Sequence, residues 1–249
     1  KERLAQPGAK KFVHTIFNKT NKGFAKANNQ GIEIAKGEYV LLLNSDTIVE
    51  DKNIEDMIVW LKDHGDVGVV SCALKNTDGS LQRNGGSFPT LFTVFNWMFF
   101  IEDIPFIDLL IPTFHPRPAK SAREQDWVTG AFMLMPKMAI LDAGLMSEDY
   151  FMYTEDVDYC YQFKQKKWKV WYLPQWSITH LGGKSSKPGA GIIKEFSSIK
   201  TFWKKNYPSW QMPVLKFLLR SGSFLRMIAF GILNGKDSGE IYAQCFKQI

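Results

Sequence analysis

A continuous apolar run that ends in a polar turn constrains this 249-residue chain more than any other feature. Residues 39–43 read Tyr-Val-Leu-Leu-Leu, and Asn44, Ser45 and Asp46 follow directly. A strand that is apolar on both faces is typical of a sheet covered by helices on both sides. The run therefore predicts a buried strand in an α/β domain, with polar side chains at its carboxyl end.

The segments around this run alternate between strand and helix patterns. The predicted order is strand 14–17, helix 24–35, strand 39–43, helix 53–64, strand 67–73, strand 127–135, helix 137–144, helix 156–166, strand 169–173. The early alternation predicts a mostly parallel sheet flanked by helices and joined by right-handed crossovers. The final 45 residues are rich in Phe, Leu and Lys, and they predict a helical appendage. We therefore expect an α/β domain over residues 1–205 and an amphipathic helical region over residues 206–249.

The net charge of +6 is spread unevenly along the chain. Residues 1–40 carry 8 Lys and Arg against 3 Asp and Glu, residues 41–181 carry 12 against 19, and residues 182–249 carry 11 against 3. The three parts thus have net charges of +5, −7 and +8. The acidic middle suits a cation-binding centre and argues against a nucleic-acid partner, whereas the basic tail suits anionic lipid or phosphate. The alternative is surface charge that simply drifts along the chain.

Three widely spaced cysteines, Cys72, Cys160 and Cys245, argue against a disulfide scaffold or a thiolate zinc site. They favour a reducing compartment, so we expect a cytoplasmic protein. A membrane-spanning helix is not expected, because no run of about 18 uninterrupted apolar residues occurs. Residues 91–111 and 210–233 are rich in Phe, Ile and Leu, and the second segment is also basic. They predict either peripheral contact with an anionic membrane surface or packing against each other or on the sheet.

Three polar clusters are candidates for chemistry. Asp46 ends the turn after the buried strand, where an oxygen ligand suits Mg²⁺ or Mn²⁺, although it could also cap the following helix. Glu155, Asp156 and Asp158 crowd a predicted helix start, either because a cation or base is needed there or because the helix dipole favours anions. His180 follows a strand and precedes two glycines, which suits a metal or phosphate ligand or a purely structural histidine.

Five ordered segments span residues 21–185: NKGFAKANNQGI, GEYVLLLNSDT, WVTGAFMLMPK, YFMYTEDVDYC and THLGGKS. Taken together, the chain resembles the family 2 inverting glycosyltransferases with the GT-A fold, and within them the rhamnosyltransferase-like branch. The resemblance implies a GT-A-like glycosyltransferase domain over residues 1–205. It also implies transfer of a hexose or deoxyhexose, rhamnose among them, from a nucleotide diphosphate sugar to a glycan or lipid-linked acceptor with inversion.

The resemblance also implies roles for individual residues. Asp46 helps to hold a Mg²⁺ or Mn²⁺ ion on the sugar-nucleotide diphosphate, with Asn44 in place of the first carboxylate of an Asp-x-Asp motif, and His180 is a further metal or diphosphate ligand. Asp156 is the general base, with Glu155 as the second choice. The implied donor-binding residues are Asn21, Gly23, Asn28, Asn44 and Asp46, and the implied acceptor-binding residues are Trp127, Gly130, Ala131 and Asp158. An inverting displacement needs both a positioned base and a cation on the leaving diphosphate.

The start of the chain departs from the family pattern. Family members usually begin with a strand like V-S-V-I-I-x-N-Y-N, then a helix and a second strand that bind the nucleotide base. Nothing before His14 resembles that opening, so we expect about one βα unit of roughly 30 residues to be missing. The alternative function is therefore a non-catalytic remnant or scaffold subunit that keeps the fold but lacks donor binding.

Overall fold

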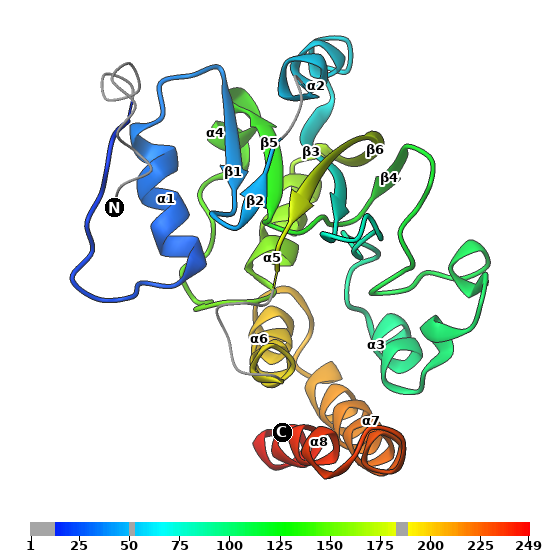
Figure 1. Cartoon of the computed structure of the whole chain (residues 1–249). Coiled ribbons are helices and arrows are strands. Elements are labelled where there is room, and N and C mark those ends of the chain that lie inside the picture. Colours follow the sequence, from blue (N-terminus) through cyan, green and yellow to red (C-terminus); the bar gives the residue numbers. More distant parts are fainter. Residues whose placement is uncertain (1–12, 50–52, 183–188) are drawn as a thin grey trace.

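The computed structural model describes residues 13–49, 53–182 and 189–249, which form a mixed six-stranded sheet with helices around it (Figure 1). The strands are β1 (Tyr39–Leu43), β2 (Thr47–Ile48), β3 (Val67–Lys75), β4 (Arg123–Gln125), β5 (Phe132–Pro136) and β6 (Lys169–His180). The helices are α1 (Phe24–Ile34), α2 (Asn53–Lys62), α3 (Leu91–Met98), α4 (Lys137–Ala143), α5 (Glu155–Gln165), α6 (Ala190–Asn206), α7 (Gln211–Leu233) and α8 (Lys236–Gln248). Two 3₁₀ turns, η2 (Ile101–Asp103) and η3 (Ile107–Leu109), follow α3.

The strand order is β1-β5-β3-β6-β2, and β4 also pairs with β6. Among the strands of the described chain, β3 and β6 make the parallel pair and every other neighbouring pair is antiparallel. The α/β class is confirmed, but the prediction of a mostly parallel sheet is wrong. β1 precedes α2 in the chain and β3 follows it, and these two strands run in the same direction, as a crossover connection requires. β5, which comes much later in the chain, lies between them and runs opposite to both.

The predicted strand at residues 14–17 is also wrong. Residues 13–18 belong to no strand of the described chain, and Phe17 is 86% exposed. An apolar run becomes a strand only where a neighbouring strand satisfies its N–H and C=O groups, and none does so here. The other predicted strands exist. β1 has the predicted bounds, whereas β3 continues to Lys75, β5 begins only at Phe132 and β6 continues to His180.

Side chains of the central strands alternate between two cores. In β5, Met133 and Met135 face the core shared with α1, α4 and α5, whereas Phe132 and Leu134 face the core covered by α2. Each such buried side chain contributes about 1.5–3 kcal/mol relative to an exposed one. Burial on both faces explains why these strands read as continuous apolar runs rather than as alternating ones.

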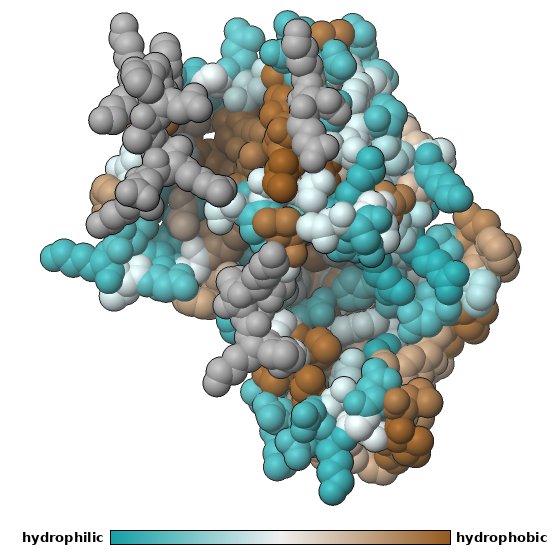
Figure 2. All heavy atoms as spheres, in the orientation of Figure 1, coloured by the Kyte–Doolittle hydropathy of each residue, from teal (hydrophilic) through white to brown (hydrophobic). Residues whose placement is uncertain are grey.

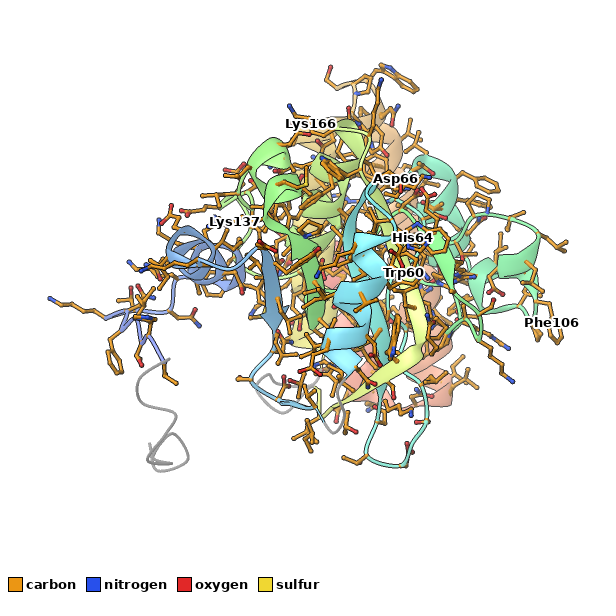
Figure 3. The ribbon with its side chains drawn as sticks, turned by 90° about the horizontal axis from the view of Figure 1, so that it is seen from above. Trp60, His64, Asp66, Phe106, Lys137 and Lys166 are labelled. Carbon is orange, nitrogen blue, oxygen red and sulfur yellow. The ribbon has the colours of Figure 1, made fainter. Side chains whose placement is uncertain are left out.

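Helix α2 is fixed to its face of the sheet by local polar contacts. At its start, the Asn53 side-chain amide donates to the carbonyl of Ser177 in β6 (3.1 Å). Near its end, His64 stacks on Trp60 with ring centroids 3.7 Å apart, and His64 Nδ1 donates to the Trp60 carbonyl (2.7 Å; Figure 3). His64 is therefore a structural histidine.

Helices α6, α7 and α8 pack together below the sheet, and α7 also packs on α3 (Figure 1). Arg226 of α7 is buried at the end of α3, where its Nε donates to the Met98 carbonyl (3.3 Å) and its Nη2 to the Trp97 carbonyl. Its guanidinium lies over the Phe100 ring, 4.4 Å from the centroid. These donors satisfy carbonyls at the helix end that have no intrahelical partner. Packing of segment 91–111 against segment 210–233 is thereby confirmed.

Three further predictions concern membrane-spanning helices, the cysteines and the boundary after residue 205. Within the described ranges, no helix is long and apolar enough to span a membrane, and the three cysteines are free and buried. The boundary between residues 205 and 206 falls at the end of α6, but one hydrophobic core joins Phe202 to Leu219 and Cys245 across it. The division into two regions stays a prediction.

Apolar side chains also gather on the outer surface of α7 (Figure 2).

Candidate active site

The turn after β1 lies where three strands meet at one end of the sheet. The backbone N–H of Asn44 donates to the Ala131 carbonyl just before β5 (3.1 Å), and the Leu181 N–H after β6 donates to the Asp46 carbonyl (2.8 Å). The short strand β2 then pairs Thr47 with His180. These backbone contacts bring together Asp46 and His180, which are far apart in the sequence.

The two side chains face each other as expected. Asp46 Oδ1 lies 3.4 Å from His180 Nε2, and the amide nitrogen of Asn44 lies 3.5 Å from the same ring nitrogen. Both residues are partly buried, with Asp46 the more exposed of the two. The juxtaposition of Asp46, Asn44 and His180 is thus present, while their role as metal or donor ligands stays a prediction.

Gln82, a residue that the sequence analysis missed, determines which nitrogen of His180 carries the proton. Its amide NH₂ donates to the His180 carbonyl (2.7 Å) and to Asn76 Oδ1 (2.7 Å), so its oxygen is the acceptor that faces His180 Nδ1 at 2.7 Å. Nδ1 must therefore donate, and in the neutral imidazole the lone pair lies on Nε2, toward Asp46. No motif indicates Gln82, because it comes from the irregular segment after β3.

This arrangement fits a divalent cation. A carboxylate oxygen and an imidazole lone pair at 3.4 Å repel each other unless a cation or a proton lies between them. In the described part of the chain, no group of three or more His, Cys, Asp and Glu side chains could hold a metal ion alone. Two protein ligands suit Mg²⁺ or Mn²⁺, since such ions commonly complete their shell with water and substrate phosphate oxygens.

Replacing His180 by Ala is expected to weaken Mn²⁺ binding in the presence of a nucleoside diphosphate by about tenfold or more, because one of two protein ligands is lost. His64→Ala is the matched control, since that imidazole is committed to Trp60. Titration followed by the electron paramagnetic resonance of free Mn²⁺ measures both. Equal Mn²⁺ affinities for the two variants would remove His180 from the site.

A strained backbone leads into α5. Tyr153 (φ 71°) and Thr154 (φ 68°) are both left-handed, a conformation that non-glycine residues rarely adopt. Such strain costs about 1 kcal/mol or more per residue and concentrates at functional sites. Here it turns the chain so that Glu155 and Asp156 open the helix at the edge of the site.

Asp156 is a half-buried carboxylate held by backbone donors. The Gly130 N–H donates to one oxygen (3.0 Å) and the Val157 N–H to the other (2.9 Å). Gly130 is required at this contact, because a Cβ there would lie 2.8 Å from the Phe24 ring. Burial raises the pKa of Asp156, while the hydrogen bonds from Gly130, Val157 and the Thr129 side chain oppose that rise.

Glu155 is more buried than Asp156, and its carboxyl group has fewer hydrogen-bond partners. Its Oε2 has no hydrogen-bond partner among the described residues. Burial, and then the neighbouring Asp156, raise its pKa from 4.5 to about 8. Several hydrogen bonds stabilise the Asp156 anion, whereas only the backbone N–H of Glu155 opposes the rise in the pKa of Glu155. Asp156 is therefore the ionised member of the pair near neutral pH, and Glu155 holds the proton.

This assignment predicts how stability depends on pH. The folded-state pKa of Glu155 lies above its unfolded value, so its contribution is present below pH 4.5 and is lost as the pH rises through about 8. The Glu155→Gln variant should not lose stability in this way, because an amide does not ionise. Thermal melts at pH 5 and pH 9 should show a higher melting temperature for the variant at pH 9 only. A wild-type advantage at pH 9 would contradict the buried neutral acid.

The two clusters share one end of the sheet through residues 130–131. Asp156 accepts from the Gly130 N–H, and the next carbonyl, that of Ala131, accepts from the N–H of Asn44. The Asp46–His180 pair and the Asp156 carboxylate are thus joined by a short run of backbone contacts. Asp46, His180 and Asp156, to which the resemblance assigns the main chemical roles, therefore lie at the same end of the sheet, while those roles stay predictions.

The other predicted donor residues make local contacts. Asn21 Oδ1 accepts from the Gly23 N–H (2.9 Å), and the Asn28 side chain donates to the Phe24 carbonyl (2.9 Å). Gly23 has φ +83°, and a Cβ there would lie 2.4 Å from the carbonyl oxygen of Phe151. These contacts position the start of α1 beside the loop that precedes α5. Donor binding by Asn21, Gly23 and Asn28 stays a prediction.

Three of the predicted acceptor residues lie in the core. Trp127 is 8% exposed and donates from Nε1 to the Ser87 carbonyl (3.1 Å), and Ala131 is 2% exposed. Asp158, 1% exposed, is enclosed by Tyr150, Gln162, Lys205 and Asn206. These contacts do not favour acceptor binding by their side chains. Gly130 is the one of the four that lies against Asp156, and the acceptor assignments stay predictions.

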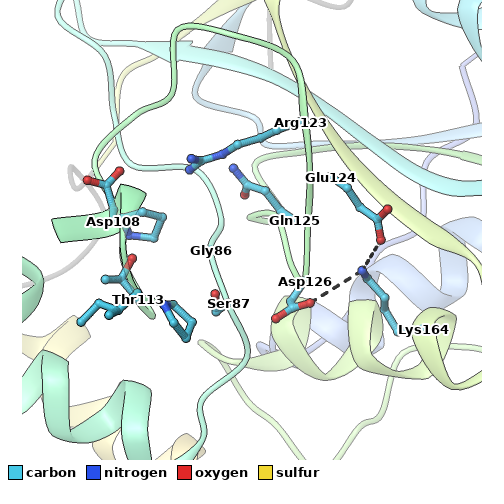
Figure 4. A pocket seen from close by; sticks show the side chains of 12 residues that line it. Gly86, Ser87, Asp108, Thr113, Arg123, Glu124, Gln125, Asp126 and Lys164 are labelled. Atoms are coloured by element: carbon cyan, nitrogen blue, oxygen red, sulfur yellow. Dashed lines mark hydrogen bonds and ion pairs between the residues drawn. The ribbon is translucent and has the colours of Figure 1, made fainter. Parts of the chain in front are cut away.

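A separate polar pocket of about 290 Å³ opens beside β4 (Figure 4). Lys164, at the far end of α5, pairs there with Glu124 (2.6 Å) and Asp126 (3.6 Å). Lys164 follows Asp156 by about 12 Å along the helix, given a rise of 1.5 Å per residue. None of the twelve lining residues is a predicted site residue, so this pocket is distinct from the candidate site.

Comparison with known proteins places the chain in a class. The sequence profile described as glycosyl transferase family 2 matches residues 2–142, more than half of the chain. The chain belongs to glycosyl transferase family 2. The solved structure of GalNAc-T7 with UDP, GalNAc and Mn²⁺ is similar over 98% of this chain and 47% of that chain, with a TM-score of 0.55 at 13% identity. The predicted family and its GT-A-like fold are thereby confirmed.

Two relatives share parts of the sequence. An N-acetylglucosaminyl-diphospho-decaprenol L-rhamnosyltransferase of Mycobacterium tuberculosis is 22% identical over 237 residues, which cover 90% of this chain and 74% of the relative. A poly-beta-1,6-N-acetyl-D-glucosamine synthase of Staphylococcus aureus is 28% identical over 154 residues, which cover 62% of this chain and 33% of the synthase. The chain thus spans a third of the synthase and less than half of GalNAc-T7.

Proposed function

We propose that this protein transfers a hexose or deoxyhexose, with rhamnose as the first candidate, from a nucleotide diphosphate sugar to a glycan or lipid-linked acceptor with inversion. The observation that carries the proposal is the presence of the Asp46–His180 pair and the Asp156 carboxylate at one end of the sheet in a family 2 chain. The name of the mycobacterial relative, an L-rhamnosyltransferase acting on a diphospho-decaprenol, supports the choice of sugar and acceptor.

In the proposed reaction, Asp156 is the general base. The acceptor hydroxyl oxygen bonds to the anomeric carbon as the bond from that carbon to the diphosphate oxygen breaks on the opposite face. The hydroxyl proton passes to Asp156, which the N–H groups of Gly130 and Val157 hold in place. Glu155 holds its own proton and so adds no second negative charge beside the leaving group. Glu155 is the alternative base.

Asp46 and His180 are the proposed ligands of a Mg²⁺ or Mn²⁺ ion. When bound, the ion neutralises charge on the leaving diphosphate. Gln82 keeps the His180 lone pair directed at that position. Asn44, whose amide lies beside His180 Nε2, is proposed to contact the donor with Asn21, Gly23 and Asn28. The acceptor is proposed to reach the half-buried Asp156 carboxylate beside Gly130.

The site of action proposed for this reaction is the cytoplasmic face of a membrane. The basic residues after position 182 support it, because cations near anionic lipid are each worth about 1 kcal/mol. A lipid-linked acceptor, as in the name of the mycobacterial relative, would present its sugar at that surface.

The experiment that tests the reaction supplies dTDP-rhamnose, UDP-N-acetylglucosamine or GDP-mannose with a lipid-linked N-acetylglucosamine diphosphate acceptor and Mn²⁺. Release of nucleoside diphosphate measures transfer, and proton NMR of the product gives the anomeric configuration. We expect release that depends on both donor and acceptor, with the anomeric configuration inverted. Retention would contradict the single displacement, and release without product would contradict transfer.

A further inference from the structure

We infer that the outward face of α7 docks the protein on an anionic lipid bilayer. The inference deepens the proposed membrane location by assigning the surface, and it does not depend on the transfer reaction. The surface consists of apolar side chains along one side of α7 together with the cations beside them. We call it the α7 stripe.

The α7 stripe is an apolar face that is interrupted near its middle by Ser221. Its members recur at helical spacing along one side of the helix and are between 39% and 79% exposed: Val214, Phe217, Phe224, Leu225, Ile228 and Ile232. They extend over about 27 Å, given a rise of 1.5 Å per residue. Isolated exposed apolar residues need no explanation, but six of them on one face of a helix indicate an interaction surface. Figure 2 shows apolar side chains gathered at α7, at the lower right.

The rest of the helix fixes this face outward. Leu215 and Leu219 are fully buried on its opposite side. A Cβ on Gly222 would lie 2.4 Å from Cβ of Met98 in α3, and Arg226 binds the end of α3. Rotation of α7 to bury the stripe would break these contacts. The stripe is therefore part of the folded surface rather than a core face awaiting closure.

Charge beside the stripe points to an anionic partner. α7 contains no Asp or Glu, and Lys216 and Arg220 are exposed on one flank of the stripe. Within the described chain, Lys204, Lys216 and Arg220 make no ion pair with a carboxylate, although Arg220 lies over the Phe246 ring. Burial lowers the pKa of Lys200, and the nearby charges of Lys216 and Lys204 lower it further. The flank thus has an uncompensated positive field.

A bilayer can accommodate both the apolar side chains of the stripe and the cations beside them. A helix lying in the membrane interface buries its apolar face at the acyl boundary and places its cations among anionic headgroups. A second copy of the chain fits less well. α7 contains no Asp or Glu, so a twofold contact along the stripe would supply no α7 carboxylate to pair with Lys216 or Arg220. Beyond α3, on which α7 packs, exposed Phe106 projects from the edge of the molecule and adds apolar surface (Figure 3).

The test is co-sedimentation of the whole chain with vesicles of phosphatidylcholine alone or of phosphatidylcholine and phosphatidylglycerol in equal parts. We expect binding that requires phosphatidylglycerol and weakens in high salt. Phe217→Glu with Ile228→Glu should abolish it. Lys216→Gln and Arg220→Gln should each weaken partitioning by about fivefold, the value of roughly 1 kcal/mol per cation.

Matched controls separate docking from general surface effects. Leu141→Glu with Met138→Glu changes two apolar side chains of α4 that are 76% and 65% exposed, and Lys62→Gln removes an exposed cation of α2. These variants should bind vesicles as the wild type does. Circular dichroism melts should show that all variants fold.

Two results would overturn the inference. In one, the wild-type chain stays in the supernatant with every vesicle, or the stripe variants bind as well as the α4 control. In the other, sedimentation velocity without lipid shows a dimer that only the stripe variants dissociate, which would assign the stripe to a second copy. Neither result affects nucleotide release in the transfer assay, so failure here is distinguishable from failure of the proposed reaction.

Discussion

Asp156→Asn is expected to lower kcat by about 10²–10⁴-fold while leaving donor affinity near normal. The amide cannot take the proton of the acceptor hydroxyl, and general-base catalysis contributes a factor of this size. The N–H groups of Gly130 and Val157 donate to different oxygens of Asp156, so the single Asn oxygen can keep only one of these hydrogen bonds. A circular dichroism melt therefore checks that the variant retains its fold. Steady-state kinetics with a saturating acceptor, together with a calorimetric donor titration, measure the two quantities separately.

Glu155→Gln is the matched control for this prediction, since it changes the adjacent carboxyl group that we take to be protonated. Its kcat near neutral pH should fall far less than that of Asp156→Asn. If Asp156→Asn retains activity and Glu155→Gln loses it, the two roles are exchanged. If both variants retain activity, this helix start does not supply the base.

Asp158→Ala is expected to destabilise the fold by about 3–5 kcal/mol, the cost of breaking a buried ion pair. The carboxylate is 1% exposed and accepts from Lys205 (2.9 Å), Asn206 (2.9 Å), Tyr150 (3.1 Å) and Gln162 (3.0 Å). Its removal leaves a partly buried ammonium and several donors without an acceptor. For a chain of this size the melting temperature should fall by roughly 6–20 °C.

The control is Asp149→Ala, which removes a second carboxylate that pairs with the same Lys205 (3.6 Å) but is 66% exposed. An exposed pair of this kind contributes little, so the melting temperature should change by no more than about 2 °C. If the two variants melt alike, Asp158 is not the anchor that joins α5 to the end of α6. If Asp158→Ala is stable but weakens acceptor binding, the acceptor role implied by the sequence is favoured instead.

The sequence predicts the local elements well because their signals are local. β1 matches its predicted residues 39–43, and α1 and α5 match theirs to within a residue. Strand pairing is not a local property, so the insertion of β5 between β1 and β3 has no sequence signal. Residues 14–17 show the same limit, since an apolar run does not reveal whether a neighbouring strand exists.

Some features of the candidate site could be predicted from the sequence, and others could not. Asp46 and His180 meet, as the resemblance implies, because short polar turns follow strands that end at the same edge of the sheet. Trp127 and Asp158 lie close in sequence to the candidate residues Gly130 and Asp156, yet their side chains are buried in the core. Which way a side chain points depends on packing partners elsewhere in the chain. Gln82 has no sequence signal, because its two hydrogen bonds to His180 exist only once β3 and β6 are side by side.

Donor binding by this chain tests the central claim most directly. Isothermal calorimetry with dTDP, UDP and GDP, each with and without Mn²⁺, measures it without an acceptor. Our account predicts that at least one of the three nucleotides binds, that its affinity requires Mn²⁺, and that Asp46→Asn weakens it by about tenfold or more. Absence of binding for all three nucleotides with Mn²⁺ present would contradict the account and favour a subunit that keeps the fold without the reaction.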